Sequence, residues 1–201
     1  MTQVFLNYRV TDQPFGAVLL DRALSERFGS DTVFLASKSI PLGADWEARM
    51  LEAVAQSAAL LVVMGPNWLG EKRPDGSRRL DDSDDFVRRE LLAADALDKV
   101  VVPVRLDCPR VAPADLPIGL SWLADRQDVE IRFRTAQADI DNLANRLAAE
   151  VPELPKPQSR STGGSTFTVA GPAENVWQTE RIEVARDFIA GPSYGRGRRK
   201  L

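Results

Sequence analysis

One glutamate in the segment DFVRRELLAADAL, residues 85–97, has the type and spacing to do chemistry. If this segment is a helix turning by about 100° per residue, Glu90 lies at the centre of its apolar face. The side chains within roughly 60° of it are those of Phe86, Val87, Ala93, Ala94 and Leu97. Such a carboxylate either pairs with a lysine or arginine across the fold or faces a cleft. In a cleft, desolvation raises the pKa of the carboxyl, which suits a reaction that develops positive charge, such as cleavage of an N-glycosidic bond.

The absence of histidine excludes several other classes of site. Ser-His-Asp and Cys-His nucleophiles, histidine metal ligands and histidine general bases are all ruled out for this chain. Cys108 is the single cysteine, so no intrachain disulfide forms and a reducing compartment is expected. The sequence has neither G-x-G-x-x-G nor a P-loop lysine motif. A nucleotide bound here would therefore be consumed as a substrate, and we expect no cofactor.

Two other acidic features have simpler interpretations. Glu47 also falls near the centre of an apolar arc, but it lies in the first turn of a predicted helix, where the helix dipole favours an acid. The run DDSDD, residues 81–85, is better explained as a helix cap and a solvated loop tip than as a metal site. Softer or suitably spaced ligands are missing, so we expect no metal.

The elements that position these residues alternate along the chain. Apolar runs predict strands at residues 4–8, 32–35, 59–65, 100–106 and 129–133. Amphipathic segments predict helices at residues 17–28, 45–56, 85–97 and 137–150, with a polar loop at 36–44 and a long loop at 66–84. This alternation indicates an α/β fold with a parallel sheet covered by helices on both faces. The strand at 59–65 is apolar on both faces and is expected at the centre of the sheet.

In an open parallel sheet, ligands bind beyond the carboxyl ends of the strands. Tyr8 and Arg9 follow the first predicted strand, and the helix that carries Glu90 begins at the same edge. Arg9 could counter a phosphate or form a salt bridge across the sheet edge. Trp46 and Phe86 offer flat surfaces for a base or a nicotinamide ring, although Trp46 could equally belong to the core.

The bulk properties describe an ordinary globular chain of 201 residues, 44% hydrophobic and 27% charged. A net charge of −3 gives no reason to expect nucleic-acid binding. No signal peptide and no apolar run of about 20 residues is found, so we expect a cytoplasmic protein without a membrane span. Composition separates a domain at residues 1–151, a Pro/Ser/Gly-rich linker at 152–166 and a short tail at 167–201. The tail is expected to serve oligomerisation or to recruit a partner such as a sensor protein.

Five segments together resemble the TIR (Toll/interleukin-1 receptor) domains of bacteria. They are VFLNYR, VFLASKSIPLGADW, LLVVMGPNWL, DFVRREL and VVVPVRL, in that order between about Val4 and Leu147. The resemblance implies a flavodoxin-like, five-stranded parallel sheet. In many members it also implies cleavage of NAD⁺ to nicotinamide and ADP-ribose, cyclic ADP-ribose or an isomer. Bacterial relatives often act in anti-phage defence and are switched on by assembly.

The resemblance also assigns roles to individual residues. The family's catalytic glutamate lies in a W-x-x-x-E pattern, which corresponds here to Phe86 through Glu90, with Phe in place of Trp. Arg9 matches the first of two arginines after the first strand, and Val10 replaces the second. Substrate contacts are therefore predicted for Tyr8, Arg9, Ser39, Trp46 and Phe86. The loop ASKSIPLGA matches the BB loop, which contacts neighbouring domains, here through Ser37, Lys38, Ile40 and Pro41.

Three functions compete at this point. The first is an NAD⁺ glycohydrolase or cyclase that needs self-association through TIR–TIR contacts. The second is a non-enzymatic scaffold that only docks other TIR domains. The third is a nucleoside-sugar hydrolase or transferase that uses the same carboxylate on smaller substrates.

Overall fold

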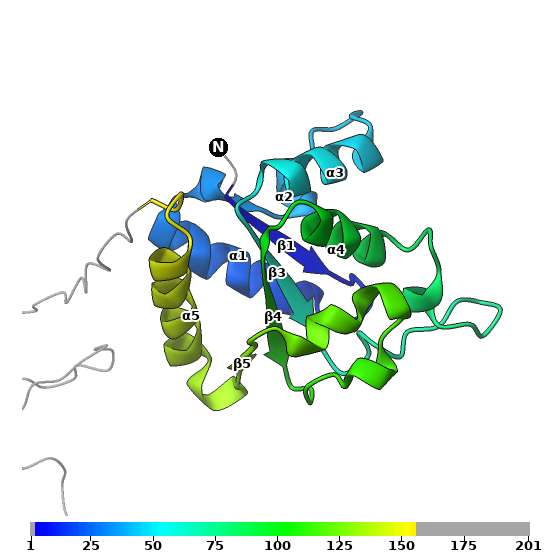
Figure 1. Ribbon diagram of the computed structural model, residues 1–201. Coiled ribbons are helices and arrows are strands. Elements are labelled where there is room, and N and C mark those ends of the chain that lie inside the picture. The colour runs from blue at the N-terminus through cyan, green and yellow to red at the C-terminus, as the bar shows by residue number, and fades with distance from the viewer. Residues whose placement is uncertain (1–2, 156–201) are drawn as a thin grey trace, which may run out of the picture. The chain divides into compact units, whose positions relative to one another are not determined.

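The computed structural model describes residues 3–155, which form a parallel sheet with helices on both faces (Figure 1). The five strands run in the order β2-β1-β3-β4-β5, and each neighbouring pair is parallel. Their bounds are β1 (Val4–Tyr8), β2 (Val33–Phe34), β3 (Ala59–Met64), β4 (Val100–Leu106) and β5 (Val129–Ile131). The predicted five-stranded, flavodoxin-like sheet is thus confirmed. The predicted tail, 167–201, and most of the predicted linker lie outside the described residues.

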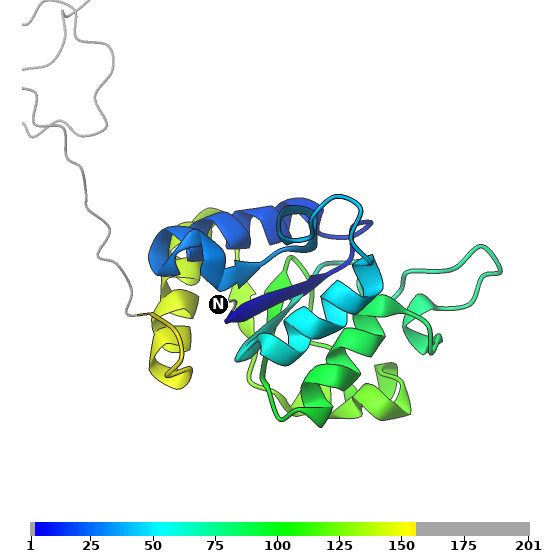
Figure 2. The ribbon, with the colours of Figure 1, turned by 90° about the horizontal axis from the view of Figure 1, so that it is seen from above.

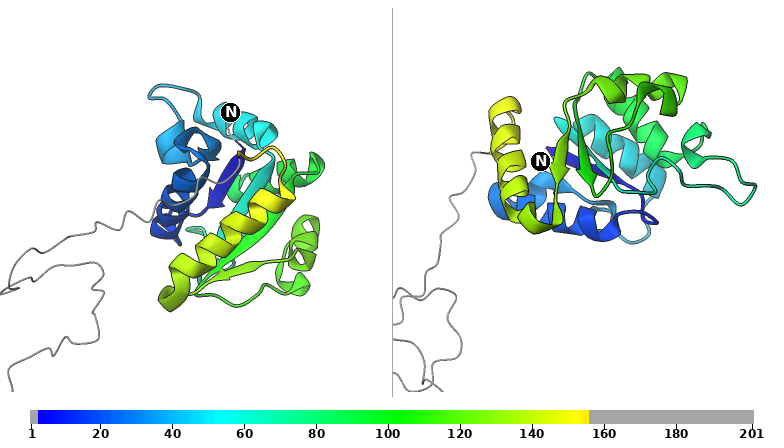
Figure 3. Two further views of the ribbon diagram at one scale, coloured as in Figure 1. Left: turned by 90° about the vertical axis from the view of Figure 1, so that its left-hand side faces the viewer. Right: turned by 90° about the horizontal axis from the view of Figure 1, so that it is seen from below.

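Two layers of helices cover the sheet. Figures 2 and 3 show α1 (Pro14–Phe28) on one side of it, and α3 (Trp46–Gln56) and α4 (Phe86–Ala96) on the other. The helix α5 (Ala136–Glu150) shares a hydrophobic cluster with α1. The alternation of side chains along β3 divides the core between these layers, because successive residues point to opposite faces. Leu61 and Val63 pack towards α1, whereas Leu60 and Val62 pack towards α3 and α4.

Local sequence signals fix where the helices begin. The carboxylates of Asp45 and Asp85 cap α3 and α4 by accepting hydrogen bonds from the backbone N–H groups of Ala48 (3.2 Å) and Arg88 (3.0 Å). The predicted helix at 17–28 in fact begins at Pro14, because proline is well accommodated in a first helical turn, where its missing N–H is not needed.

Two further boundaries differ from the prediction. The expected polar loop at 36–44 opens with one helical turn, α2 (Ala36–Ser39), too short for any apolar period to reveal. The expected strand at 129–133 ends at Ile131, and Phe133 begins a 3₁₀ turn with its side chain 97% exposed. Residues 107–128, for which no element was expected, contain 3₁₀ helices at Pro113–Asp115 and Ile118–Asp125.

A hydrogen-bonded link joins the loops that follow β1 and β3. The Asp12 carboxylate accepts hydrogen bonds from the N–H groups of Gly65 (2.7 Å) and Asn67 (2.9 Å). Gly65 is required at this contact, since a Cβ atom there would lie 2.3 Å from Cγ of Gln13. The two loops therefore hold the carboxyl ends of neighbouring strands in a fixed relation, on the edge where a site is expected.

Candidate active site

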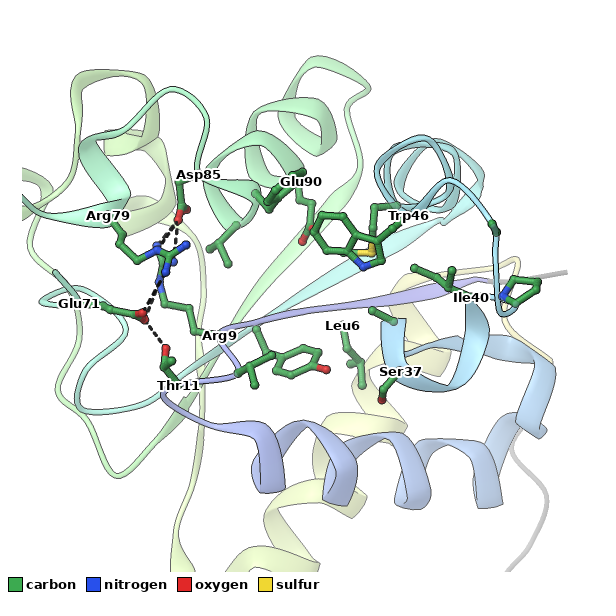
Figure 4. Close-up of a pocket in the computed structure, with 18 of the residues that line it drawn as sticks. Leu6, Arg9, Thr11, Ser37, Ile40, Trp46, Glu71, Arg79, Asp85 and Glu90 are labelled. Atoms are coloured by element: carbon green, nitrogen blue, oxygen red, sulfur yellow. Dashed lines mark hydrogen bonds and ion pairs between the residues drawn. The ribbon is translucent and has the colours of Figure 1, made fainter. Parts of the chain in front are cut away.

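A pocket of about 620 Å³ opens at the carboxyl end of β1 (Figure 4). Its walls come from β1 and the residues after it, from the segment 36–46, from the loop at 71–79 and from the first turns of α4. Four of the predicted substrate-contacting residues line it, together with the predicted acid: Tyr8, Arg9, Trp46, Phe86 and Glu90. The fold thus brings together side chains that are up to 82 positions apart in sequence (90 − 8).

Glu90 lies on the pocket wall and is 3% exposed. Its Oε2 atom accepts a hydrogen bond of 2.7 Å from Nδ2 of Asn7, which also donates to the carbonyl of Val87 at 3.2 Å. No lysine or arginine of the described chain forms an ion pair with Glu90, so the alternative of a structural salt bridge does not hold. Burial raises the pKa of Glu90 to about 8, against the lowering effect of the Asn7 hydrogen bond.

Asn7 is the site residue that the sequence analysis missed. It is fully buried in β1, and one amide group fixes both the carboxyl of Glu90 and the turn of α4 that carries it. A signal was present in VFLNY, where a single amide interrupts an otherwise apolar strand. A buried amide needs partners, because an unpaired polar group inside a protein is costly.

Arg9 forms the salt bridge that was one of its two expected roles. Its Nη1 and Nη2 atoms donate to the Asp85 carboxylate at 2.8 and 3.0 Å, and Nε donates to the carbonyl of Trp68 at 3.2 Å. The side chain lines the pocket but is only 5% exposed. Most of its donors are therefore directed into the protein.

Trp46 and Phe86 form an aromatic pair between α3 and α4. Their rings meet edge to face, with centroids 4.3 Å apart. Trp46 is 42% exposed, so it is a wall residue and not part of the core. The Arg89 guanidinium lies 5.3 Å from the Phe86 ring centroid and also pairs with Glu47. Glu47 lies in the first turn of α3, as expected, and the structure adds Arg89 as a partner that the sequence did not predict.

The segment predicted to contact neighbouring domains divides into two parts. Ser37, Ile40 and Pro41 line the pocket, and the neighbouring Leu42 lines it with its side chain fully exposed. Lys38 instead points to Asp21, with Nζ 2.5 Å from Oδ1. The Ser39 hydroxyl, predicted to contact substrate, accepts a hydrogen bond from Leu35 N–H (3.2 Å) and is not among the pocket-lining residues.

The remaining candidates have structural surroundings. Asp85 caps α4 as expected, and no group of metal-ligating side chains occurs within residues 3–155. The thiol of Cys108 is partly buried, which raises its pKa and leaves it weakly nucleophilic at neutral pH. No helix in the described part of the chain is long and apolar enough to span a bilayer.

Comparison with known proteins identifies the family. The TIR domain family matches residues 4–147, so the chain belongs to the TIR domain family. Among solved structures, the TIR domains of the activated Roq1 resistosome, which directly recognizes the pathogen effector XopQ, give a TM-score of 0.51 at 16% identity. This match covers 75% of the present chain and 99% of the other. At this identity the likeness establishes the fold alone.

Two animal TIR structures are also similar at a lower level. A metazoan TIR-STING receptor from C. gigas, in complex with 2′,3′-cGAMP, gives a TM-score of 0.47 at 17% identity, covering 70% of this chain and 39% of the other. The TIR domain of the Toll-related receptor TRR-2 from Hydra magnipapillata gives 0.42 at 16% identity, covering 76% and 100%. No curated protein sequence matches the chain significantly.

Proposed function

We propose that the pocket binds NAD⁺ and cleaves its N-glycosidic bond to release nicotinamide, with Glu90 as the catalytic carboxylate. One observation carries this proposal: a buried acid with no basic partner lies on the wall of a pocket of about 620 Å³. A pocket of this size suits a ligand of nucleotide dimensions. Membership of the TIR family supports the choice of NAD⁺ among such ligands.

The chemistry follows from the charge of the substrate. In NAD⁺ the nicotinamide ring carries a positive charge, and a cation close to Glu90 favours the ionised form of its carboxyl. When the glycosidic bond breaks, its electron pair leaves with the ring, and nicotinamide departs as a neutral molecule. The positive charge passes to the ribose as an oxocarbenium ion, which the carboxylate stabilises by charge and by contact with the ribose hydroxyls.

The cation is then captured by one of two nucleophiles. If water attacks, it loses a proton and the product is ADP-ribose. If a nitrogen of the substrate's own adenine attacks, the product is cyclic ADP-ribose or an isomer. The Trp46–Phe86 pair provides a surface on which a ring can lie during these steps.

Activity that depends on self-association is part of the same proposal. Leu42 is fully exposed beside the pocket, in the segment that corresponds to the BB loop. An exposed large apolar side chain at a loop tip suits a contact with a second TIR domain. We also propose a role in bacterial defence signalling, with the tail at 167–201 as a segment that serves oligomerisation or recruits a sensor.

The test is the release of nicotinamide from NAD⁺ by concentrated protein, with and without a crowding agent. The wild type is expected to release it, and Glu90→Gln to lose at least about 100-fold of the rate, because the residue acts directly on the reacting ribose. Glu47→Gln is the matched control: it removes one acid from the neighbouring helix, outside the pocket lining, and should keep most of the activity. Release that persists undiminished in Glu90→Gln would disprove the assignment.

The exposed Leu42 equally suits a scaffold that only joins TIR domains. That alternative predicts self-association without nicotinamide release under every assembling condition, and the same signalling from Glu90→Gln as from the wild type. A nucleoside-sugar hydrolase is distinguished by its substrates, because it would cleave free nucleosides faster than NAD⁺.

A further inference from the structure

The polar end of the pocket contains two arginines that differ in exposure and in hydrogen bonding. Arg9 is 5% exposed and donates hydrogen bonds to Asp85 and to the Trp68 carbonyl. Arg79, from the 3₁₀ turn Arg79–Asp81, has a side chain that is 47% exposed. Its nearest anionic atoms are Oε1 of Glu71, 3.5 Å from Nη1, and Oδ2 of Asp85, 3.6 Å from Nε. Within the described residues its guanidinium donates no side-chain hydrogen bond that meets normal geometry.

We propose that Arg79 is the anion-binding residue of this pocket and takes the diphosphate group of the substrate. This inference rests on the proposed function and adds to it, because neither the sequence motifs nor the family resemblance pointed to Arg79. A guanidinium offers paired N–H groups that match two phosphate oxygens, and such charge-assisted bonds are stronger than its present contacts beyond 3.4 Å. Arg9 cannot serve in this way without giving up its buried bonds to Asp85.

The two carboxylates beside Arg79 are held by other donors. Asp85 accepts from Arg9 and from the N–H of Arg88, and Glu71 accepts a 2.5 Å hydrogen bond from the Thr11 hydroxyl. Neither acid therefore depends on Arg79 for its hydrogen bonds. A diphosphate that binds Arg79 must nevertheless overcome the negative charge of Glu71, so Glu71 limits how tightly an anion binds.

The position of Arg79 also sets the direction of the bound dinucleotide. In Figure 4, Arg79 and Glu71 lie at one end of the pocket, Trp46 and Ile40 lie at the other, and Glu90 lies between them. With the diphosphate at Arg79 and the nicotinamide at the aromatic end, the glycosidic bond between them faces Glu90. An uncharged nucleoside would be held less firmly in this pocket, because it lacks the diphosphate group that Arg79 binds.

The test measures binding of two ligands to the Glu90→Gln protein, which keeps them uncleaved. NAD⁺ carries the diphosphate, and nicotinamide riboside has the same ring and ribose without it. Adding Arg79→Gln should weaken NAD⁺ binding by about 10- to 100-fold and change nicotinamide riboside binding by less than about 2-fold. Arg79→Lys should recover part of the loss, and Glu71→Gln should tighten NAD⁺ binding.

Arg73→Gln is the matched control, since Arg73 lies in the same loop with similar exposure (44%), pairs with Asp82 and does not line the pocket. Equal weakening of both ligands by Arg79→Gln, no weakening of NAD⁺, or the same effect from Arg73→Gln would each overturn the inference. A different result would overturn the proposed function alone: the protein with Glu90 intact binds NAD⁺ through Arg79 but never releases nicotinamide. If NAD⁺ at millimolar concentration does not bind, both proposals are overturned.

Discussion

Two buried carboxylates lie five positions apart at the start of α4, and their surroundings differ. Asp85 is 5% exposed and accepts hydrogen bonds from both terminal nitrogens of Arg9 and from the N–H of Arg88. Glu90 is 3% exposed and accepts one hydrogen bond, from the amide of Asn7. The two acids are buried to a similar depth, and they differ in the number and charge of their partners.

The difference shows how one helix can carry both a structural and a reactive acid. The bidentate pair of Asp85 with Arg9 ties β1 to the start of α4. A buried carboxylate without a counter-ion favours its neutral form, and its pKa rises. Asp85 thus stabilises the fold, whereas Glu90 costs stability and is left free for an incoming positive charge.

The largest expected effect on the free energy of unfolding comes from replacing Asp85, the buried acid that pairs with Arg9. Asp85→Asn removes the carboxylate that holds both terminal nitrogens of the buried Arg9, and breaking such a pair costs about 3–5 kcal/mol of unfolding free energy. Urea unfolding at pH 7 measures this loss. Asp82→Asn is the control, because the Asp82 side chain is 22% exposed and its loss should cost less than about 1 kcal/mol. Equal effects of the two changes would mean that the Arg9–Asp85 pair contributes no more than a surface pair.

Replacing Glu90, the buried acid without a counter-ion, should instead raise the free energy of unfolding. The pKa of Glu90 is raised to about 8 in the folded protein, so this carboxyl stays protonated in the fold while it ionises in the unfolded chain. Below about pH 4.5 the carboxyl is protonated in both states, and its full contribution to the free energy of unfolding is present. This contribution is lost as the pH rises to about 8, at a rate of at most about 1.4 kcal/mol per pH unit. Glu90→Gln should remove this dependence and be more stable than the wild type at pH 8.

Unfolding curves at pH 5, 6.5 and 8 measure the comparison. The gain of Glu90→Gln over the wild type should grow with pH across the series. The matched control is Glu47→Gln, which removes an acid whose side chain is 49% exposed and should not reproduce the gain at pH 8. A gain that does not grow with pH would show that Glu90 is already ionised in the folded protein.

The smallest expected effect comes from the single partner of Glu90. Asn7→Leu keeps the approximate size of the side chain and removes the donor that favours the ionised carboxyl. The pKa of Glu90 should then rise further, and the acid limb of nicotinamide release should move to higher pH by about 1 unit. The pH profile of kcat/KM measures the shift, and Asn142→Ala on the exposed face of α5 should leave it in place. An unmoved profile would contradict the role of Asn7.

The sequence predicted those features of fold and site that depend on local patterns. A continuous apolar run predicted the central position of β3, and helical periodicity predicted that Glu90 lies on the inner face of α4. The pattern was wrong for Leu97, which is 49% exposed, because the helix ends at Ala96 and the periodicity no longer holds there.

The partners of the site residues could not be predicted in this way. Asn7 meets Glu90 across 83 positions and Arg9 meets Asp85 across 76, and both contacts depend on the packing of α4 against β1. Periodicity places a side chain on a face, but it does not say which donor lies opposite. The same limit applies to Lys38 and Ser39, whose short helical turn directs them to Asp21 and Leu35.

The isolation of Glu90 has a consequence for the proton balance of ligand binding. The chain has no histidine, and burial raises the pKa of Glu90 to about 8, so this carboxyl changes charge near that pH. A cationic ring that enters the pocket draws the carboxyl into its ionised form and sends one proton to the buffer. Association with an oxidised, positively charged nicotinamide would then tighten with rising pH, while association with its neutral reduced counterpart would not.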